Sequence, residues 1–261
     1  MMSSLPAAGK PDRENDPTSA VINEAGPAAG VEAAPNPRLD ELVALLAQLR
    51  APGGCAWDRE QTHASLVQYL VEETHELVDA IEAGDDAELV EELGDVLYQV
   101  LFHADIAREE GRFTLEDVAA HMTQKMVGRH PHVFGDESAK TAAEVVVMWD
   151  ERKKIEKPTR TSVLDGIPQG MPSLALADKI LGRAAKVGLE LPGAPTLRDV
   201  ATPAPANATT APASAPSDER ELGDLLLGIV AAAKANGLDS ERALRSSLRE
   251  LQQQIREAEI T

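Results

Sequence analysis

Residues 71–96 read VEETHELVDAIEAGDDAELVEELGDV, and this stretch decides the fold. Apolar residues recur in it every three or four positions, which is typical of amphipathic α-helices, and Gly84-Asp85-Asp86 interrupts the pattern. Two helices joined by so short a break fold back on each other as a hairpin. The stretch therefore predicts an antiparallel helical hairpin with a group of acidic side chains on each arm.

The acidic side chains of this hairpin are placed unusually. At about 100° per residue, Glu73 falls inside the apolar stripe of the first helix, while Glu76 lies on its flank and Glu72 further round on the same side. On the second helix, Glu92 and Asp95 occupy one flank of the stripe. Merely solvated acids would lie opposite the stripe, and a core-facing carboxylate is costly unless it is paired or binds a metal. The hairpin therefore predicts a cation site.

The ligand types narrow the choice of metal. Carboxylates without cysteine favour Mg²⁺, with Mn²⁺ as a second candidate, over zinc. Residues 72–75 also contain the Glu-x-x-His motif of di-iron bundles, but that class needs two such motifs and the chain has one. His130 and His132 flank Pro131 with no cysteine nearby, which favours a packed turn over a zinc site. Magnesium is the expected ion.

The composition excludes several classes of protein. A formal net charge of -19 argues against general affinity for nucleic acid, because such binding requires a basic face. The sequence has no apolar run of membrane-span length, and its first residues lack the apolar segment of a signal peptide. The single cysteine, Cys55, excludes an intramolecular disulfide and suits a reducing compartment. We expect a cytoplasmic protein that binds neither nucleic acid nor a membrane.

Every strong element in the sequence is helical, which predicts an all-α fold. Thr62 is expected to cap the first arm of the hairpin, and Thr114 with Asp117 and Thr141 with Glu144 read as capping boxes. The expected helices span about 39–50, 62–83, 85–110, 114–128, 141–157, 173–187, 219–236 and 240–260.

Composition also divides the chain into four segments. Residues 1–36 are rich in small and polar residues and read as a disordered tail, and residues 37–191 form the main helical domain. Residues 192–217 read as an extended Pro/Ala/Thr linker. Residues 218–261 hold two helices that are too few for a stable core of their own, so we expect them to dock on the first domain or on a partner subunit.

Three motifs resemble those of one family. EETHE (72–76) and EELGD (91–95) look like the EExxE and ExxD signature of the MazG family of nucleoside triphosphate pyrophosphohydrolases. GGCAWDREQT (53–62) is similar to that family's CPWD-type connector, with Ala56 in the proline position, and KMVGRHPHVFGD (125–136) resembles its KxxxRHPHVF segment. The similarity runs from about Pro37 to Gly188, and all three motifs in order are strongly specific.

The resemblance implies a function and a set of site residues. It implies an all-α bundle, dimeric or higher, that converts a nucleoside triphosphate and water into the monophosphate and pyrophosphate with Mg²⁺. It assigns the metal to Glu73, Glu76, Glu92 and Asp95 with Glu72 nearby, and phosphate oxygens to Lys125 and Arg129. It also assigns substrate binding to Trp149 and Lys153, with the tryptophan near the nucleotide base. We favour Glu73 as the general base, because burial would raise its pKa toward the useful range.

The sequence does not decide the substrate range. A broad housekeeping enzyme, a narrower one for dUTP, dCTP or phosphoribosyl-ATP, and a nucleotide-sensing module without catalysis are the alternatives, and the complete acid set argues against the last. Residues 221–224, ELGD, repeat 92–95, but the linker stands where a second EExxE helix belongs. We therefore expect Glu221 and Asp224 to be vestigial and only the first module to be active.

Overall fold

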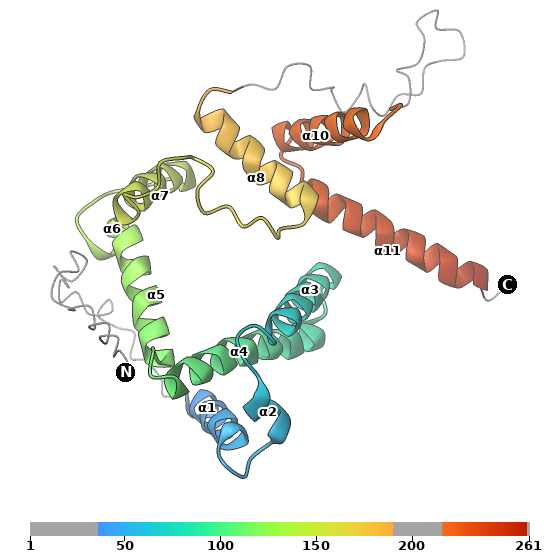
Figure 1. Cartoon of the computed structure of the whole chain (residues 1–261). Helices are drawn as coiled ribbons and strands as arrows, with labels where there is room; N and C mark the ends of the chain where they lie inside the picture. Colours follow the sequence, from blue (N-terminus) through green and yellow to red (C-terminus); the bar gives the residue numbers. More distant parts are fainter. Residues whose placement is uncertain (1–35, 190–215, 260–261) are drawn as a thin grey trace, which may run out of the picture. The chain divides into compact units, whose positions relative to one another are not determined.

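The computed structural model describes residues 36–189 and 216–259, and every regular element in these ranges is a helix (Figure 1). This confirms the all-α fold class. The chain divides after Lys153 into two compact units. The predicted tail and linker fall almost wholly outside the described residues, and the predicted domain boundaries stay a prediction. No helix among the described residues has the length and apolarity that a membrane span requires.

The first unit is built around the hairpin. Its helices are α1 (Pro37–Arg50), α2 (Ala56–Glu60), α3 (Val67–Ala83), α4 (Asp86–Glu109), α5 (Leu115–Arg129), α6 (Pro131–Phe134) and most of α7 (Ala142–Glu156), which ends just past the boundary. α3 and α4 pack along each other (Figure 1). Gly84 ends α3 with a φ of 73°, and the Asp85 side chain accepts hydrogen bonds from the backbone N–H groups of Ala87 and Glu88. The Gly84-Asp85 break therefore ends α3 and begins α4, as the sequence predicts.

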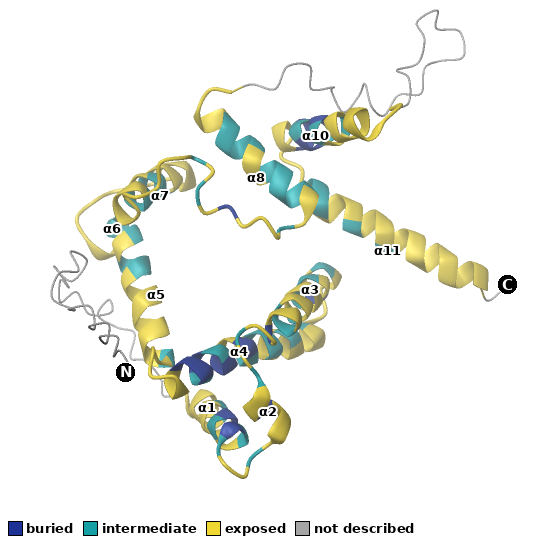
Figure 2. Cartoon of the chain, in the orientation of Figure 1, coloured by how far each residue is buried: buried dark blue, intermediate teal, exposed yellow. Residues whose placement is uncertain are grey.

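The apolar core of this unit lies at the end of the hairpin away from the Gly84 turn. The buried residues of α4 gather in its C-terminal half (Figure 2). The core cluster consists of Leu46, Leu66, Leu101, Phe102 and Ile106. The acidic part of the hairpin lies between this core and the turn, so its carboxylates are held by packed helices without being enclosed.

Arg50 at the end of α1 ties three helices together. It is only 6% exposed, and its guanidinium binds Asp105 at 2.8 Å, Glu109 at 2.5 Å and the backbone carbonyl of Asp58 at 2.6 Å. The same group lies 5.1 Å from the ring centre of Phe102. Because Asp105 and Glu109 belong to α4 and Asp58 to α2, Arg50 fixes α1 and α2 against the hairpin.

Some helix limits differ from the sequence prediction. Thr62 does not cap α3, which begins five residues later at Val67. The Thr62 hydroxyl instead accepts a hydrogen bond from the Ser65 N–H, so residues 62–65 form a separate turn. The segments expected to be irregular contain the short helices α2 and α6. Trp57, expected in a core or interface, is 49% exposed and packs edge-on against Tyr69.

The second unit contains α8 (Ser173–Lys186), α10 (Glu219–Ala235) and α11 (Ser240–Glu259). α10 packs on α8, and α11 contacts both. Val230, Ala232 and Ala233 of α10 are buried, and Lys234 forms an ion pair with Asp178 of α8 at 2.9 Å. The two C-terminal helices thus pack against α8.

Candidate functional site

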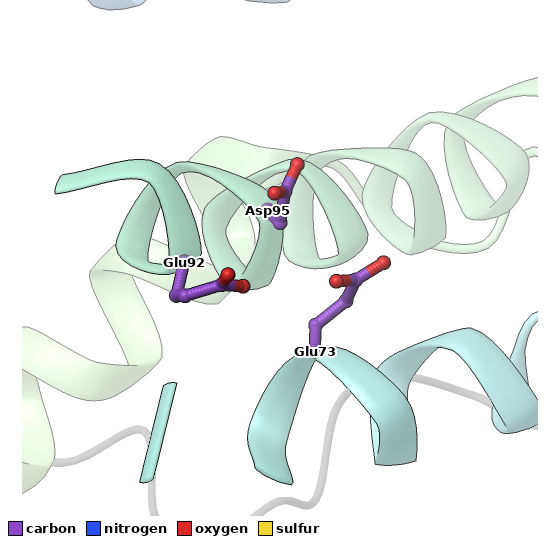
Figure 3. Close-up of side chains that lie close together, drawn as sticks. All are labelled: Glu73, Glu92 and Asp95. Carbon is purple, nitrogen blue, oxygen red and sulfur yellow. The ribbon is translucent and has the colours of Figure 1, made fainter. Parts of the chain in front are cut away.

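Three carboxylates converge between the two arms of the hairpin. Glu73 comes from α3, and Glu92 and Asp95 come from α4 (Figure 3). One carboxylate oxygen from each lies within 4.8 Å of the other two. This is the only group of three or more potential metal ligands among the described residues. The helical phase that placed Glu73 in the apolar stripe brings it opposite the acids of α4.

The electrostatics of this group suit a cation. Burial raises the pKa of Glu73, and the charge of Asp95 with a hydrogen bond that the protonated Glu73 donates to Glu76 raises it further. Burial likewise raises the pKa of Glu92, followed by the charges of Glu76 and Asp95. The Oε2 atom of Glu92 is buried and has no hydrogen-bond partner. A hard divalent cation would neutralise the repulsion and bind the unpartnered oxygen, so the donor set fits Mg²⁺ or Mn²⁺.

The remaining acids of the predicted ligand set lie at the edge of this group. Glu76 is close enough to Glu73 to share a hydrogen bond and to Glu92 to raise its pKa. Glu72 is exposed and does not belong to the group of three. The assignment of all five acids as metal ligands stays a prediction, with the strongest geometric support for Glu73, Glu92 and Asp95.

The predicted phosphate and base residues lie on α5 and α7. Lys125 and Arg129 are four residues apart on α5, and both are partly buried. On α7, the Lys153 ammonium lies 5.9 Å from the ring centre of Trp149 and 3.8 Å from Asp150. The Trp149 Nε1 atom is buried and has no hydrogen-bond partner. The roles of these four residues stay predictions.

His130 connects these two pairs. Its ring packs edge-on against Trp149, with ring centres 5.3 Å apart, and it directly follows Arg129 in the chain. A groove of about 1030 Å³ is lined by residues of α5 and α6, by Gly135 and by Arg152 of α7, and none of the four predicted substrate residues lines it. The contact of His130 with Trp149 therefore brings Trp149 to the C-terminal end of α5, where Arg129 lies.

His103 and Gln99 extend the polar face of α4 beyond the acids, and His63 from the turn before α3 contacts it. His103 does not join the acid group; its Nδ1 atom lies 2.7 Å from Nδ1 of His63, and burial lowers its pKa. Gln99 is buried, and its Oε1 atom has no partner. Neither His63 nor Gln99 was expected from the sequence. A signal for Gln99 existed, because it stands one helical turn after Asp95 on the same face.

Comparison with known proteins decides the family. Residues 61–134 match the MazG nucleotide pyrophosphohydrolase domain. The chain is 39% identical to the nucleoside triphosphate pyrophosphohydrolase/pyrophosphatase MazG of Thermotoga maritima, over 84% of this chain and 85% of that protein. The chain belongs to the MazG family. It is also 38% identical to a nucleoside triphosphate pyrophosphohydrolase of Escherichia coli K12, over 85% of this chain and 87% of that protein.

The chain is also similar to an uncharacterized protein and to a solved structure. An uncharacterized 26.1 kDa protein of Streptomyces cacaoi is 43% identical over 86% of this chain and 84% of its own length. A crystal structure of a mazG-related protein from Thermotoga maritima is 30% identical and covers 44% of this chain and 98% of that one, with a TM-score of 0.39. The matched region 61–134 contains both acidic motifs and the Lys125–Arg129 pair, whereas Trp149 and Lys153 lie beyond it.

Proposed function

We propose that this MazG-family chain is a hydrolase that cleaves nucleoside triphosphates between the α and β phosphates, releasing the monophosphate and pyrophosphate. The observation that carries the proposal is the convergence of Glu73, Glu92 and Asp95 within 4.8 Å of one another. Relatives 38–39% identical over most of the chain bear the name of this activity, which supports it.

The acid group supplies the cation site in this proposal. Glu73, Glu92 and Asp95 hold Mg²⁺, or Mn²⁺ in its place, with Glu76 as a fourth ligand and Glu72 beside them. When bound, the cation supplies positive charge to the phosphate oxygens at the cleaved bond. Glu73 also serves as the general base in this proposal, because burial favours the protonated form of its carboxyl and so makes it a better proton acceptor.

The rest of the substrate is held by α5 and α7. Lys125 and Arg129 bind phosphate oxygens and stabilise the charge that develops on them. Trp149 lies beside the base, where its ring offers a stacking surface and its buried Nε1 a free donor. Lys153 holds its charge over the same ring. Because stacking tolerates any base, this arrangement favours a broad substrate range over one restricted to dUTP, dCTP or phosphoribosyl-ATP. The protein would act in the cytoplasm.

The proposal includes a homodimer or a higher homo-oligomer. α4 exposes a row of apolar side chains on the side away from the acid group: Val90 (73% exposed), Leu93 (51%), Leu97 (39%) and Val100 (41%). Their spacing of three and four residues makes one continuous face. A second copy of the hairpin would bury this face and complete a four-helix layer.

The test is turnover of a panel of ribo- and deoxynucleoside triphosphates with Mg²⁺, in which pyrophosphate and orthophosphate are measured separately. We expect pyrophosphate from several bases, loss of turnover in Glu92→Gln, and near-normal turnover in the neighbouring exposed variant Glu91→Gln. Orthophosphate alone, or no turnover of any triphosphate, would contradict the function. Turnover of one base alone would contradict the broad range and leave the reaction itself supported.

A further inference from the structure

Gln99 is a buried polar side chain that the proposed mechanism does not use. It is only 7% exposed, and its Oε1 atom is buried without a hydrogen-bond partner. Buried polar groups in folded proteins are almost always hydrogen-bonded, because an unpaired carbonyl has lost its water without compensation. An acceptor in this condition points to a donor that arrives with a ligand.

The position of Gln99 relates it to the acid group. At about 100° per residue, its direction from the α4 axis falls between those of Glu92 and Asp95, on the side of α4 that meets α3. It stands four residues after Asp95, which is about 6 Å along the helix axis. Gln99 therefore continues the acid face toward the apolar core and away from the Gly84 turn.

The second unit has a position that corresponds to Gln99 beside an incomplete acid set. Aligning Glu221-Leu222-Gly223-Asp224 with residues 92–95 places Gly228 at the position of Gln99. The burial pattern keeps the same register, because Val230 and Ala233 are buried as Leu101 and Ala104 are. α10 thus packs with no side chain at this position. Packing alone therefore does not require a glutamine at this position, and the role of Gln99 belongs to the intact site.

Resting on the proposed function, we propose that Gln99 determines sugar specificity by accepting a hydrogen bond from a sugar hydroxyl of the nucleoside triphosphate. The reason is chemical. The acid group binds the phosphate end through a cation, and ionised phosphates have no proton to donate to a carbonyl. The sugar hydroxyls are the first donors that the substrate offers beyond its α-phosphate, and a spacing of about 6 Å suits them.

The experiment compares kcat/KM for ATP, 2′-deoxy-ATP, 3′-deoxy-ATP and 2′,3′-dideoxy-ATP in wild type and in Gln99→Met, which keeps the length of the side chain. In the wild type, removal of one hydroxyl should lower kcat/KM by about tenfold or more, because the buried acceptor is left unpaired. In Gln99→Met, kcat/KM for ATP should fall to the wild-type kcat/KM for the deoxynucleotide that lacks the hydroxyl bound by Gln99. The kcat/KM of the variant for 2′,3′-dideoxy-ATP should equal that of wild type.

Exposed Gln68 on α3 provides the matched control, and Gln68→Met should behave as wild type with all four nucleotides. The inference is overturned if wild type hydrolyses all four equally well, a result that does not depend on the variant folding. It is also overturned if Gln99→Met lowers all four by the same factor, because that would indicate a purely structural role. A wild type that hydrolyses none of them removes the proposed function itself, so the two failures are distinguishable.

Discussion

At the scale of single residues, a carboxylate turned toward a neighbouring helix has consequences that a solvated one does not. Burial and the nearby acids raise the pKa values of Glu73 and Glu92. Without a cation, the folded state therefore keeps protons that the unfolded chain releases near pH 4.5. The stability that these two groups contribute is present below that pH and is lost as the pH rises through their folded pKa values.

This leads to a pH prediction for Glu73→Gln, which carries no titrating group at this position. In EDTA, wild type and variant should have similar melting temperatures near pH 4, and the variant should become the more stable of the two as the pH rises to 8. Thermal unfolding followed by circular dichroism at constant ionic strength measures the difference. The neighbouring-position control Glu91→Gln, outside the group of three, should diverge much less, because its charge is only a minor cause of the raised pKa of Glu92. A constant difference across the range would contradict the prediction.

Addition of Mg²⁺ should reverse the order. A ligand that binds only the folded state stabilises it by about 2.7 kcal/mol at one hundred times its Kd. Wild type should gain this stability at pH 8, and Glu73→Gln should gain much less because it lacks one ligand of the group. The measurement is the melting temperature against Mg²⁺ concentration, with Glu91→Gln again as control. Equal gains in wild type and Glu73→Gln would remove Glu73 from the metal site.

At the scale of elements, Arg50 is the residue on which the packing of α1 and α2 against α4 depends. The Arg50 side chain is 4% exposed and that of its partner Asp105 is 10% exposed, so removing the arginine would leave the buried Asp105 with only the half-exposed Arg108 as an ion-pair partner. Arg50→Met should lower the free energy of unfolding by about 3 kcal/mol or more. Urea denaturation at pH 7 measures this loss.

Arg38 gives the matched control for Arg50. Its ion pair with Glu41 joins side chains that are 89% and 62% exposed, so Arg38→Met should cost less than about 1 kcal/mol. If the two variants lost the same stability, Arg50 would be no more than a surface cation, and the positioning of the hairpin would rest on its apolar core alone.

The elements also show how far the sequence predicts this fold. Local chemistry was sufficient where a cap is made by neighbouring residues: Thr114 with Asp117 and Thr141 with Glu144 form the predicted capping boxes. It failed at Thr62, because Ser65 competes for the same hydroxyl and delays the helix. Helix type follows from periodicity, whereas the choice between two nearby local hydrogen bonds does not.

In the candidate site, too, some features were predictable from the sequence and others were not. Helical phase predicted that Glu73 meets Glu92 and Asp95, because a hairpin fixes which faces oppose each other. Phase could not predict that Gln99 would lack a partner or that His63 would contact His103, since both depend on side-chain positions across separate segments. Periodicity thus locates a face, and only tertiary packing shows which of its polar atoms are left unpaired.

At the scale of the whole molecule, the second unit lacks the means to build the same site. Glu221 stands in the first turn of α10, where its carboxylate accepts hydrogen bonds from the N–H and hydroxyl of Ser217. These bonds lower its pKa. The residue that corresponds to Glu92 therefore caps a helix. No third acid joins Glu221 and Asp224 in a ligand group among the described residues.

We therefore expect the double variant Glu221→Ala/Asp224→Ala to hydrolyse triphosphates with a kcat within about twofold of wild type, and to lose some thermal stability through the missing cap. Steady-state kinetics with Mg²⁺ and a thermal melt measure the two effects. The matched pair in the first unit, Glu92→Ala/Asp95→Ala, should abolish turnover. If the second-unit variant lost turnover and the first-unit variant kept it, catalysis would belong to the second unit and our assignment would be wrong.

The homodimer can be tested by asking whether one site draws on two copies. Among the described residues, α7 packs against neither α3 nor α4, and α5 contacts α4 but not α3, so the base and phosphate residues of one copy have no contact with the helix that carries its own Glu73. If a partner copy supplies them, Glu73→Gln and Arg129→Gln should each be inactive alone. Their mixture, after exchange of subunits, should regain about a quarter of wild-type activity, because half of the dimers then contain one intact site of two.

Mixing either variant with the double variant Glu73→Gln/Arg129→Gln is the control and should regain nothing. If the first mixture also stays inactive while size-exclusion chromatography shows exchanged dimers, each copy builds its site from its own residues.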